Sequence, residues 1–219
     1  MDEREANLVA SRLEMVRDQL QARGIRHQGV LDAFGEIPRE RFVPANHLHE
    51  AYADQPVPIG HAQTISQPYI VALMVQELDP RPGHRVLDVG AGSGYQTAIL
   101  ARLAGHVCAL ERIDELTERA LATLAALNVT NVTFCTRDGS LGWPEEAPFD
   151  RIICGAGAPG VPQPWIDQLC DGGRIVAPIG GSDIQTLTIV EKVGGRIRRR
   201  ETCDVRFVHL IGRMAWPEV

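Results

Sequence analysis

Residues 85–95 constrain the fold of this chain more than any other stretch, because the sequence pattern changes twice within them. Val86, Leu87 and Val89 form a short apolar run that three glycines end, and a helical pattern begins with residues 97–100. That order predicts a strand, a tight turn and a helix. Glycine has no Cβ and lets a backbone approach a ligand closely, and free amides at a helix start favour polar or anionic groups. The turn is therefore a candidate ligand site.

The spacing of the glycines separates two classes of cofactor. A dinucleotide-binding turn, Gly-x-Gly-x-x-Gly/Ala, needs a small residue at position 95, where the helix packs closely on the strand. Tyr95 stands there, which argues against a nicotinamide cofactor. The form found here, with Gly90, Gly92 and Gly94 after Leu-Asp-Val, resembles the first motif of S-adenosylmethionine-dependent methyltransferases. A purely structural glycine bend is the plain alternative.

Composition narrows the possible partners. The 219 residues carry a formal net charge of −6, which argues against a broad binding surface for nucleic acid or for an anionic membrane. The basic run 196–200 is interpreted as charge on a solvated edge strand. We find no apolar signal core and no run long enough to span a membrane, so we expect a cytoplasmic protein. The five cysteines and seven histidines lack metal-ligand spacing, and we predict no metal site and buried free thiols.

The first part of the chain is helical and then irregular. Apolar residues spaced four, three and four apart predict a helix over 9–20, and a shorter helix follows over 28–34. From 51 to 68 the periodicity stops, which indicates an ordered, functional loop, and Pro68 begins a helix that reaches Leu78. We expect one domain over 1–219, in which 1–80 is a helical extension with the substrate loop and 81–219 is the cofactor-binding core with the C-terminal strands.

The rest of the chain alternates between strands and helices. Strands are predicted at 106–111, 132–136, 150–154 and 174–178, with helices at 115–127 and 164–169. This alternation predicts an α/β fold with a doubly wound, mostly parallel sheet, Rossmann-like as in methyltransferases. Residues 186–193 and 196–205, joined by Gly194 and Gly195, predict a C-terminal antiparallel strand pair.

Ligands of such sheets bind beyond the carboxyl ends of the strands, so acidic residues there are candidates. Glu111 ends the strand after the glycine turn, where a carboxylate can accept hydrogen bonds from both ribose hydroxyls. Asp138 and Gly139 follow the next strand, where a carboxylate can meet an adenine amino group. Each has a plain alternative: Glu111 as a charge at a helix start, and Asp138-Gly139 as a simple turn.

The residues after the fourth strand argue against one class of substrate. Enzymes that methylate exocyclic amines of bases place Asn or Asp, two prolines and an aromatic residue there, to hold the amine and stack the flipped base. This chain has Gly-Ala-Gly-Ala-Pro at 155–159. A nucleic-acid amine is therefore not the expected substrate.

Four motifs together resemble the protein-L-isoaspartate O-methyltransferase family. They are the segment 38–44 (PRERFVP), the segment 59–68 (IGHAQTISQP), the glycine turn, and the segment 205–208 (VRFV). The similarity runs over nearly the whole chain. It implies S-adenosyl-L-methionine as cofactor, S-adenosyl-L-homocysteine as product, and isoaspartyl-containing proteins and peptides as partners.

The resemblance also implies the site residues. Ser66 corresponds to the family's active-site serine, with Thr64 beside it; a plain alternative is that Ser66 only caps the helix after it. The implied cofactor-binding residues are Gln63, Ile65, Asp88, Gly90, Gly92, Gly94, Glu111, Asp138 and Gly139. The chain departs from the family at Ala62, where glycine is common, and at His209, where proline is common.

The implied reaction is methyl transfer to the free α-carboxylate of an L-isoaspartyl residue, which starts repair through a succinimide. This carboxylate has a pKa near ~3.5–4 and is ionised at neutral pH, so no general base is required. Ser66 is then expected to position the acceptor, in a groove formed by residues 52–68 and 207–211. Two alternatives remain open: an O-methyltransferase of a small carboxylate or hydroxyl compound, and a non-catalytic S-adenosylmethionine-binding protein.

Overall fold

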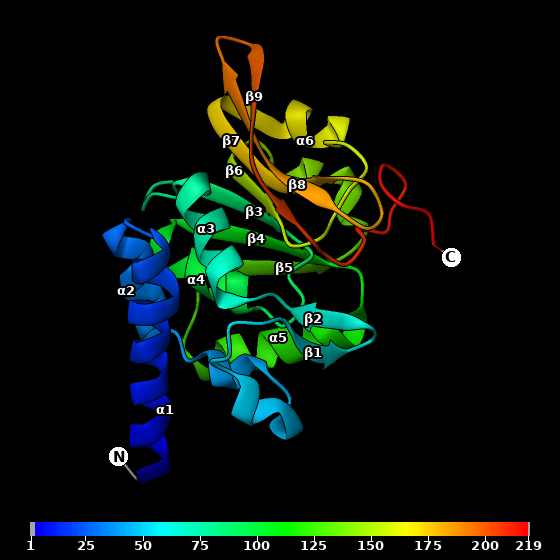
Figure 1. Ribbon diagram of the computed structural model, residues 1–219. Helices are drawn as coiled ribbons and strands as arrows, with labels where there is room; N and C mark the ends of the chain where they lie inside the picture. The colour runs from blue at the N-terminus through cyan, green and yellow to red at the C-terminus, as the bar shows by residue number, and fades with distance from the viewer. Residues whose placement is uncertain (1–2, 219) are drawn as a thin grey trace.

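The computed structural model describes residues 3–218, and its centre is a seven-stranded sheet with helices on both faces (Figure 1). The strand order is β5-β4-β3-β6-β7-β8-β9. The strands are β3 Arg85–Val89, β4 His106–Glu111, β5 Val132–Thr136, β6 Phe149–Cys154, β7 Leu169–Gly180, β8 Gln185–Val193 and β9 Arg196–Val205. The α-helices are α1 Glu3–Glu14, α2 Gln28–Glu36, α3 Pro68–Leu78, α4 Tyr95–Leu103, α5 Asp114–Ala126 and α6 Gln163–Gln168.

Strands β3 to β7 are mutually parallel, and β8 and β9 finish the sheet as antiparallel neighbours. The predicted doubly wound, mostly parallel fold with a C-terminal antiparallel pair is therefore confirmed. Neighbouring residues of a buried strand point to opposite faces. Val86 accordingly joins one apolar cluster, with α3 and α4, while Leu87 and Val89 join the other, with Trp165 of α6. The parallel arrangement brings the carboxyl ends of β3, β4, β5 and β6 to one edge.

The amino-terminal extension is helical as expected, with different limits. The helix predicted over 9–20 already begins at Glu3, and its last turn, Met15–Leu20, widens into a π-helix. The second helix, predicted over 28–34, extends to Glu36. The extension packs on the core through aromatic rings: Phe34 and Phe42 both contact the ring of Tyr95 edge-on, with centroids 5.8 and 5.4 Å away. The amino-terminal extension thus packs against Tyr95, the first residue of α4.

The segment 51–68, predicted to be an irregular loop, contains a small hairpin. Its strands are β1 Val57–Gly60 and β2 Gln63–Ile65, and Figure 1 shows them apart from the main sheet and beside α5. The prediction missed them because Pro58 argues against a strand and because the turn lacks the expected glycines. His61 and Ala62 form that turn with φ of 53° and 56°, in the left-handed region.

The carboxyl-terminal part differs from the prediction mainly at β7. This strand runs from Leu169, five residues before the predicted start at 174, because Leu169 already pairs with Phe149 of β6, whereas the pairing with β8 begins at Arg174. Gly194 and Gly195 make the predicted two-residue turn, with φ of 57° and 72°. After β9 the chain returns across the sheet edge, where His209 pairs with Gly157. Within residues 3–218 no helix is both long and apolar enough to cross a membrane.

Candidate active site

Three cavities adjoin the carboxyl edge of the sheet. The strand-end pocket lies against the ends of β3 and β4 and is closed by the chain after β9, residues 208–211. The tail groove, of about 470 Å³, lies between the start of α3 and residues 203–208. The junction cavity is a small space between the glycine turn and residues 64–66. Together they form a continuous candidate site.

Two residues line all three cavities: Thr64 of β2 and Gly155, which follows β6. Ser66 lines the tail groove and the junction cavity. Within residues 3–218 the hydroxyls of Thr64 and Ser66 have no described hydrogen-bond partner, whereas the Ser66 carbonyl accepts a bond from Arg39. The N-cap residue of α3 is Gln67, whose side chain makes no capping hydrogen bond, so Ser66 does not serve as the helix cap. Two free hydroxyls therefore stand where the cavities meet.

Glu111 occupies the predicted position in the strand-end pocket. Its Oε2 accepts a 2.8 Å hydrogen bond from the amide of Gly92, which ties the end of β4 to the glycine turn. Its Oε1 accepts from the amides of Arg112 and Ile113, at 2.7 and 3.1 Å. A carboxylate has about four lone-pair sites, so Oε2 keeps one for a ligand hydroxyl. The side chain is oriented before any ligand arrives.

The glycines of the turn divide their roles. Gly90 and Gly92 line the strand-end pocket and the junction cavity. Gly94 lines none of the three described cavities; it caps α4 with φ 86°, and a Cβ there would come within 3.0 Å of the Cβ of Ala120. Gly94 is thus required by the packing of α4 on α5. The predicted cofactor-binding set thus contains both residues that line cavities and residues required for packing.

Asp88 lies beneath the pocket and does not line it. The residue is completely buried, and its carboxylate accepts hydrogen bonds from Gln96, at 2.7 Å, and from the Thr97 hydroxyl, at 2.6 Å. Loss of hydration raises the pKa of Asp88 to about 6, although both hydrogen bonds oppose the shift. The described contacts of Asp88 thus join β3 to the first turn of α4.

Asp138 and Gly139 also differ in their relation to the pocket. Gly139 lines the strand-end pocket, and its carbonyl accepts a 2.9 Å hydrogen bond from the indole of buried Trp165. The Asp138 carboxylate instead accepts bonds from Ser140 and from the amide of Arg213, at 2.8 Å. Asp138 therefore anchors the carboxyl-terminal segment over the pocket.

The segment after β9 forms the outer wall. His209 lines the strand-end pocket; its ring stacks on Trp216, with centroids 5.2 Å apart, and its Nε2 lies 2.9 Å from the carbonyl of Ser182. The amide of Gly157 donates to the carbonyl of Val208, and the Gly157 carbonyl accepts from Leu210. The other departure from the family, Ala62, lies at the turn of the β1–β2 hairpin. The expected groove between residues 52–68 and 207–211 corresponds to this wall and the tail groove.

Three positions near the site escaped the prediction. Arg39 holds the carbonyls of Ala51 and Ser66, and Arg119 of α5 donates to the carbonyl of Ile59 at 2.8 Å. In the sequence, Gly155 counts only as evidence against an amine substrate. Arginines that bind main-chain carbonyls leave no spacing signal in a sequence, whereas Gly155 does carry one, because it follows a strand end, where ligands of such sheets bind. Within residues 3–218 no three His, Cys, Asp or Glu side chains are grouped as a metal site.

Comparisons with known proteins identify the family. The sequence profile of the family "Protein-L-isoaspartate(D-aspartate) O-methyltransferase (PCMT)" matches residues 11–215. A protein-L-isoaspartate O-methyltransferase of Methanoregula boonei is 49% identical over 205 residues, covering 94% of each chain. One from Roseiflexus sp. is 50% identical over 199 residues, covering 91% of each. A crystal structure of a Plasmodium falciparum protein-L-isoaspartate O-methyltransferase, in complex with S-adenosyl-L-homocysteine, superimposes with a TM-score of 0.81 at 29% identity, covering 91% of this chain and 98% of that one. The chain belongs to the protein-L-isoaspartate(D-aspartate) O-methyltransferase family.

Proposed function

We propose that this chain transfers a methyl group from S-adenosyl-L-methionine to the free α-carboxylate of L-isoaspartyl residues in damaged proteins and peptides, and so starts their repair. Family membership supports the reaction class. The observation that carries the proposal is the meeting of the three cavities at Thr64 and Gly155. A cofactor in the pocket and an acceptor in the groove then face each other at one place.

The strand-end pocket fits this cofactor. Glu111 offers a pre-oriented carboxylate for hydroxyl groups, Gly90 and Gly92 allow close approach of a ligand, and Leu110 and Ile113 add apolar lining. When bound, S-adenosyl-L-methionine supplies an electrophilic methyl group on a sulfonium. Glu111 and the glycine turn would hold its ribose and amino-acid parts. Asp88 and Asp138 would support this pocket from beneath and from the tail.

On the acceptor side, the free hydroxyls of Thr64 and Ser66 orient the carboxylate. Its ordinary pKa is near ~3.5–4, so the group is ionised at neutral pH and the chain needs no general base. The contribution of the protein is then to align two reactants at about 3 to 3.5 Å and to exclude water. Ile65, Val71 and Tyr95 add apolar surface to the lining of the junction cavity, which would help to exclude water from the reacting groups.

The chemistry after methyl transfer needs no further residue of the protein. The backbone amide nitrogen that follows the ester attacks the ester carbonyl, methanol leaves, and a succinimide ring closes. Water then opens the ring at either carbonyl and gives aspartate or isoaspartate. Repair therefore emerges from repeated cycles.

The tail groove is open enough to accept many sequences, as such an enzyme requires. Its lining combines the large apolar residues Tyr69, Ile70 and Phe207 with the neighbouring residues of the segment 203–208. We further propose that residues 1–80 and 81–219 act as one domain, because both contribute to one apolar cluster around Tyr95. The proposed place of action is the cytoplasm, whose aged proteins would be the substrates.

The test is methyl transfer from labelled S-adenosyl-L-methionine to two matched peptides, one with L-isoaspartate and one with aspartate at the same position. We expect labelling of the isoaspartyl peptide alone. Equal labelling of both would point to a general carboxylate O-methyltransferase. No labelling, with S-adenosyl-L-homocysteine shown to bind by calorimetry, would refute the proposal in favour of a small-molecule acceptor or a silent binding protein.

A further inference from the structure

Arg39 is a buried cation that the reaction proposed above does not use. It begins the short 3-10 turn Arg39–Phe42 and is completely buried. Its described partners are two carbonyl groups and an aromatic ring, and none of the ion pairs described within residues 3–218 includes it. Burial lowers the pKa of the guanidinium to about 10, which leaves it protonated at neutral pH. A buried charge without a counter-charge is costly, so its contacts require an explanation.

The two carbonyls belong to the ends of one segment. Nε of Arg39 donates to the carbonyl of Ala51 at 2.7 Å, and Nη2 donates to the carbonyl of Ser66 at 2.8 Å. The segment between them carries the β1–β2 hairpin and Thr64. Two N–H groups of one planar guanidinium thus fix both ends of residues 51–66, which we call the acceptor segment. A guanidinium is suited to this because its donors have fixed geometry.

The ring connects that segment to the cofactor side. The guanidinium carbon of Arg39 lies 4.9 Å from the centroid of the Tyr95 ring, within cation–π range. Tyr95 is the first residue of α4, directly after Gly94, and Phe34 and Phe42 pack against its edges. The Arg39 side chain therefore links the position of the Ser66 main chain to that of the glycine turn.

We infer that Arg39 is a positioning residue, which aligns the Thr64–Ser66 segment with the glycine turn so that acceptor and cofactor meet at the junction cavity. This inference rests on the proposed function. In this role the planar geometry of the guanidinium matters as well as its charge, because an ammonium cannot bind both carbonyls in the same plane. A displacement of about 1 Å at a reacting centre costs on the order of 100-fold in rate.

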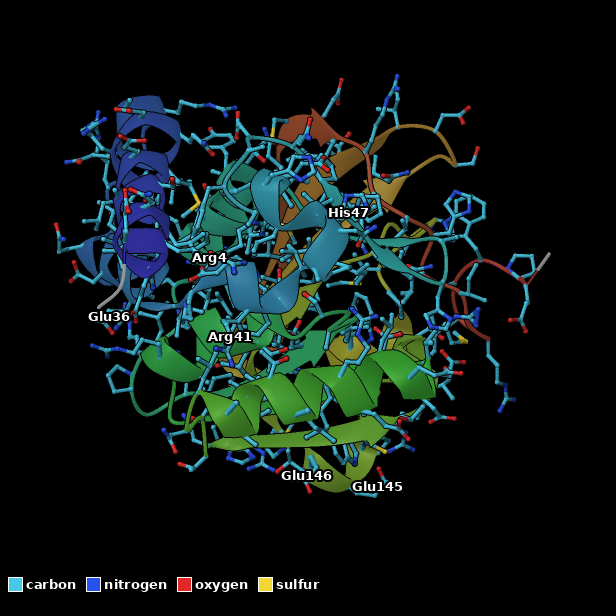
Figure 2. The ribbon with its side chains drawn as sticks, turned by 90° about the horizontal axis from the view of Figure 1, so that it is seen from below. Arg4, Glu36, Arg41, His47, Glu145 and Glu146 are labelled. Carbon is cyan, nitrogen blue, oxygen red and sulfur yellow. The ribbon has the colours of Figure 1, made fainter. Side chains whose placement is uncertain are left out.

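The test compares Arg39→Lys and Arg39→Met with Arg41→Lys and Arg41→Met as matched controls. Arg41 belongs to the same turn, but its side chain is exposed and faces α5 across a separate cavity (Figure 2). Both Arg39 variants are expected to lower kcat for the isoaspartyl peptide by roughly 30- to 300-fold. The affinity for S-adenosyl-L-homocysteine, measured by calorimetry, should change less than about threefold, and both Arg41 variants should match the parent chain.

Hydrogen exchange supplies a readout that does not depend on the acceptor. Amides of residues 57–66 should lose protection in both Arg39 variants and keep it in the Arg41 variants, even if no isoaspartyl peptide is ever methylated. Parent-like turnover in Arg39→Lys would overturn the inference, because charge alone would then suffice. So would an equal loss of cofactor affinity and turnover, which indicates a general structural role.

A second substitution keeps the inference testable if the Arg39 variants fail to fold. Tyr95→Leu retains an apolar side chain and removes the ring beneath the guanidinium, whereas Tyr95→Phe keeps the ring. We expect Tyr95→Leu to lower kcat by roughly 3- to 30-fold at nearly constant affinity for S-adenosyl-L-homocysteine, and Tyr95→Phe to have little effect. Equal kcat in both variants would overturn the inference.

Discussion

The two halves of the site are built differently. On the cofactor side, Glu111, Gly90 and Gly139 stand at strand ends, and their positions follow from the hydrogen bonding of the parallel sheet. On the acceptor side, Thr64 and Ser66 belong to a segment outside the main sheet, held by single side chains that bind its carbonyls. Damage on the first side should therefore change cofactor affinity, and damage on the second side should change turnover.

The largest expected effect is on the cofactor side. Glu111→Ala removes a carboxylate that binds three amides and, in the proposed complex, a ribose hydroxyl. Hydrogen bonds to a charged group contribute about 1.5–3 kcal/mol each, and the variant loses both the ligand bond and the bond that holds Gly92 in the glycine turn, so we expect the affinity for S-adenosyl-L-homocysteine to fall by roughly 100- to 1,000-fold. Calorimetric titration measures it, with Glu115→Ala, an exposed carboxylate of α5, as control. A change below threefold in Glu111→Ala would remove Glu111 from the cofactor site.

Asp88 gives a pH dependence on the same side. Its pKa is about 6 in the folded chain and about 3.9 in an unfolded one, so between these values the folded chain binds more protons. Stability then falls as pH rises from about 4 to about 6, by on the order of 3 kcal/mol from this group. Asp88→Asn should remove that slope.

Urea unfolding at pH 4, 5, 6 and 7 tests the expectation. As the pH rises, the unfolding free energy of Asp88→Asn should increase relative to that of the parent chain. The unfolding free energy of the exposed Asp183→Asn should change with pH as that of the parent chain does. Parallel curves for all three chains would show that Asp88 titrates normally.

On the acceptor side, a substitution should lower turnover and leave the cofactor affinity nearly unchanged. Ser66→Ala removes a hydroxyl that lines the junction cavity without binding any described residue, so the fold loses no hydrogen bond. We expect kcat for the isoaspartyl peptide to fall by roughly 10- to 100-fold while cofactor affinity stays within threefold. Ser182→Ala, at an exposed loop, is the matched control. Unchanged turnover in Ser66→Ala would assign the orienting role to Thr64 or to main-chain amides alone.

The difference between the two sides also explains which parts of the site could be predicted from the sequence. Apolar periodicity and the glycine turn indicated the sheet and its ligand edge, because local pattern and sheet geometry are linked. Glu111 and Gly139 followed from their places at strand ends. Arg39 did not, because its role depends on carbonyls at Ala51 and Ser66 that only the folded chain brings together. The family resemblance implies that Asp88 and Asp138 bind the cofactor, but their described partners are Gln96, Thr97, Ser140 and Arg213.

The smallest expected effect concerns the hairpin within the acceptor segment. Ala62 has φ 56°, a left-handed conformation that costs an L-residue on the order of 1 kcal/mol and that glycine adopts freely. Ala62→Gly should therefore raise the unfolding free energy by about 0.5–1 kcal/mol and Tm by about 1–4 °C, with unchanged turnover.

The matched control makes the same exchange in a helix. Ala122 is an exposed residue inside α5, where glycine costs about 1 kcal/mol relative to alanine, so Ala122→Gly should lower stability by about as much as Ala62→Gly raises it. Thermal unfolding of the two variants and the parent decides the question. If Ala62→Gly also lowers Tm, the stiffness that alanine gives to the unfolded chain outweighs the cost of the left-handed conformation. Opposite signs would show that the acceptor segment holds a small strain, which its side-chain anchors must sustain and the strand ends of the cofactor side do not carry.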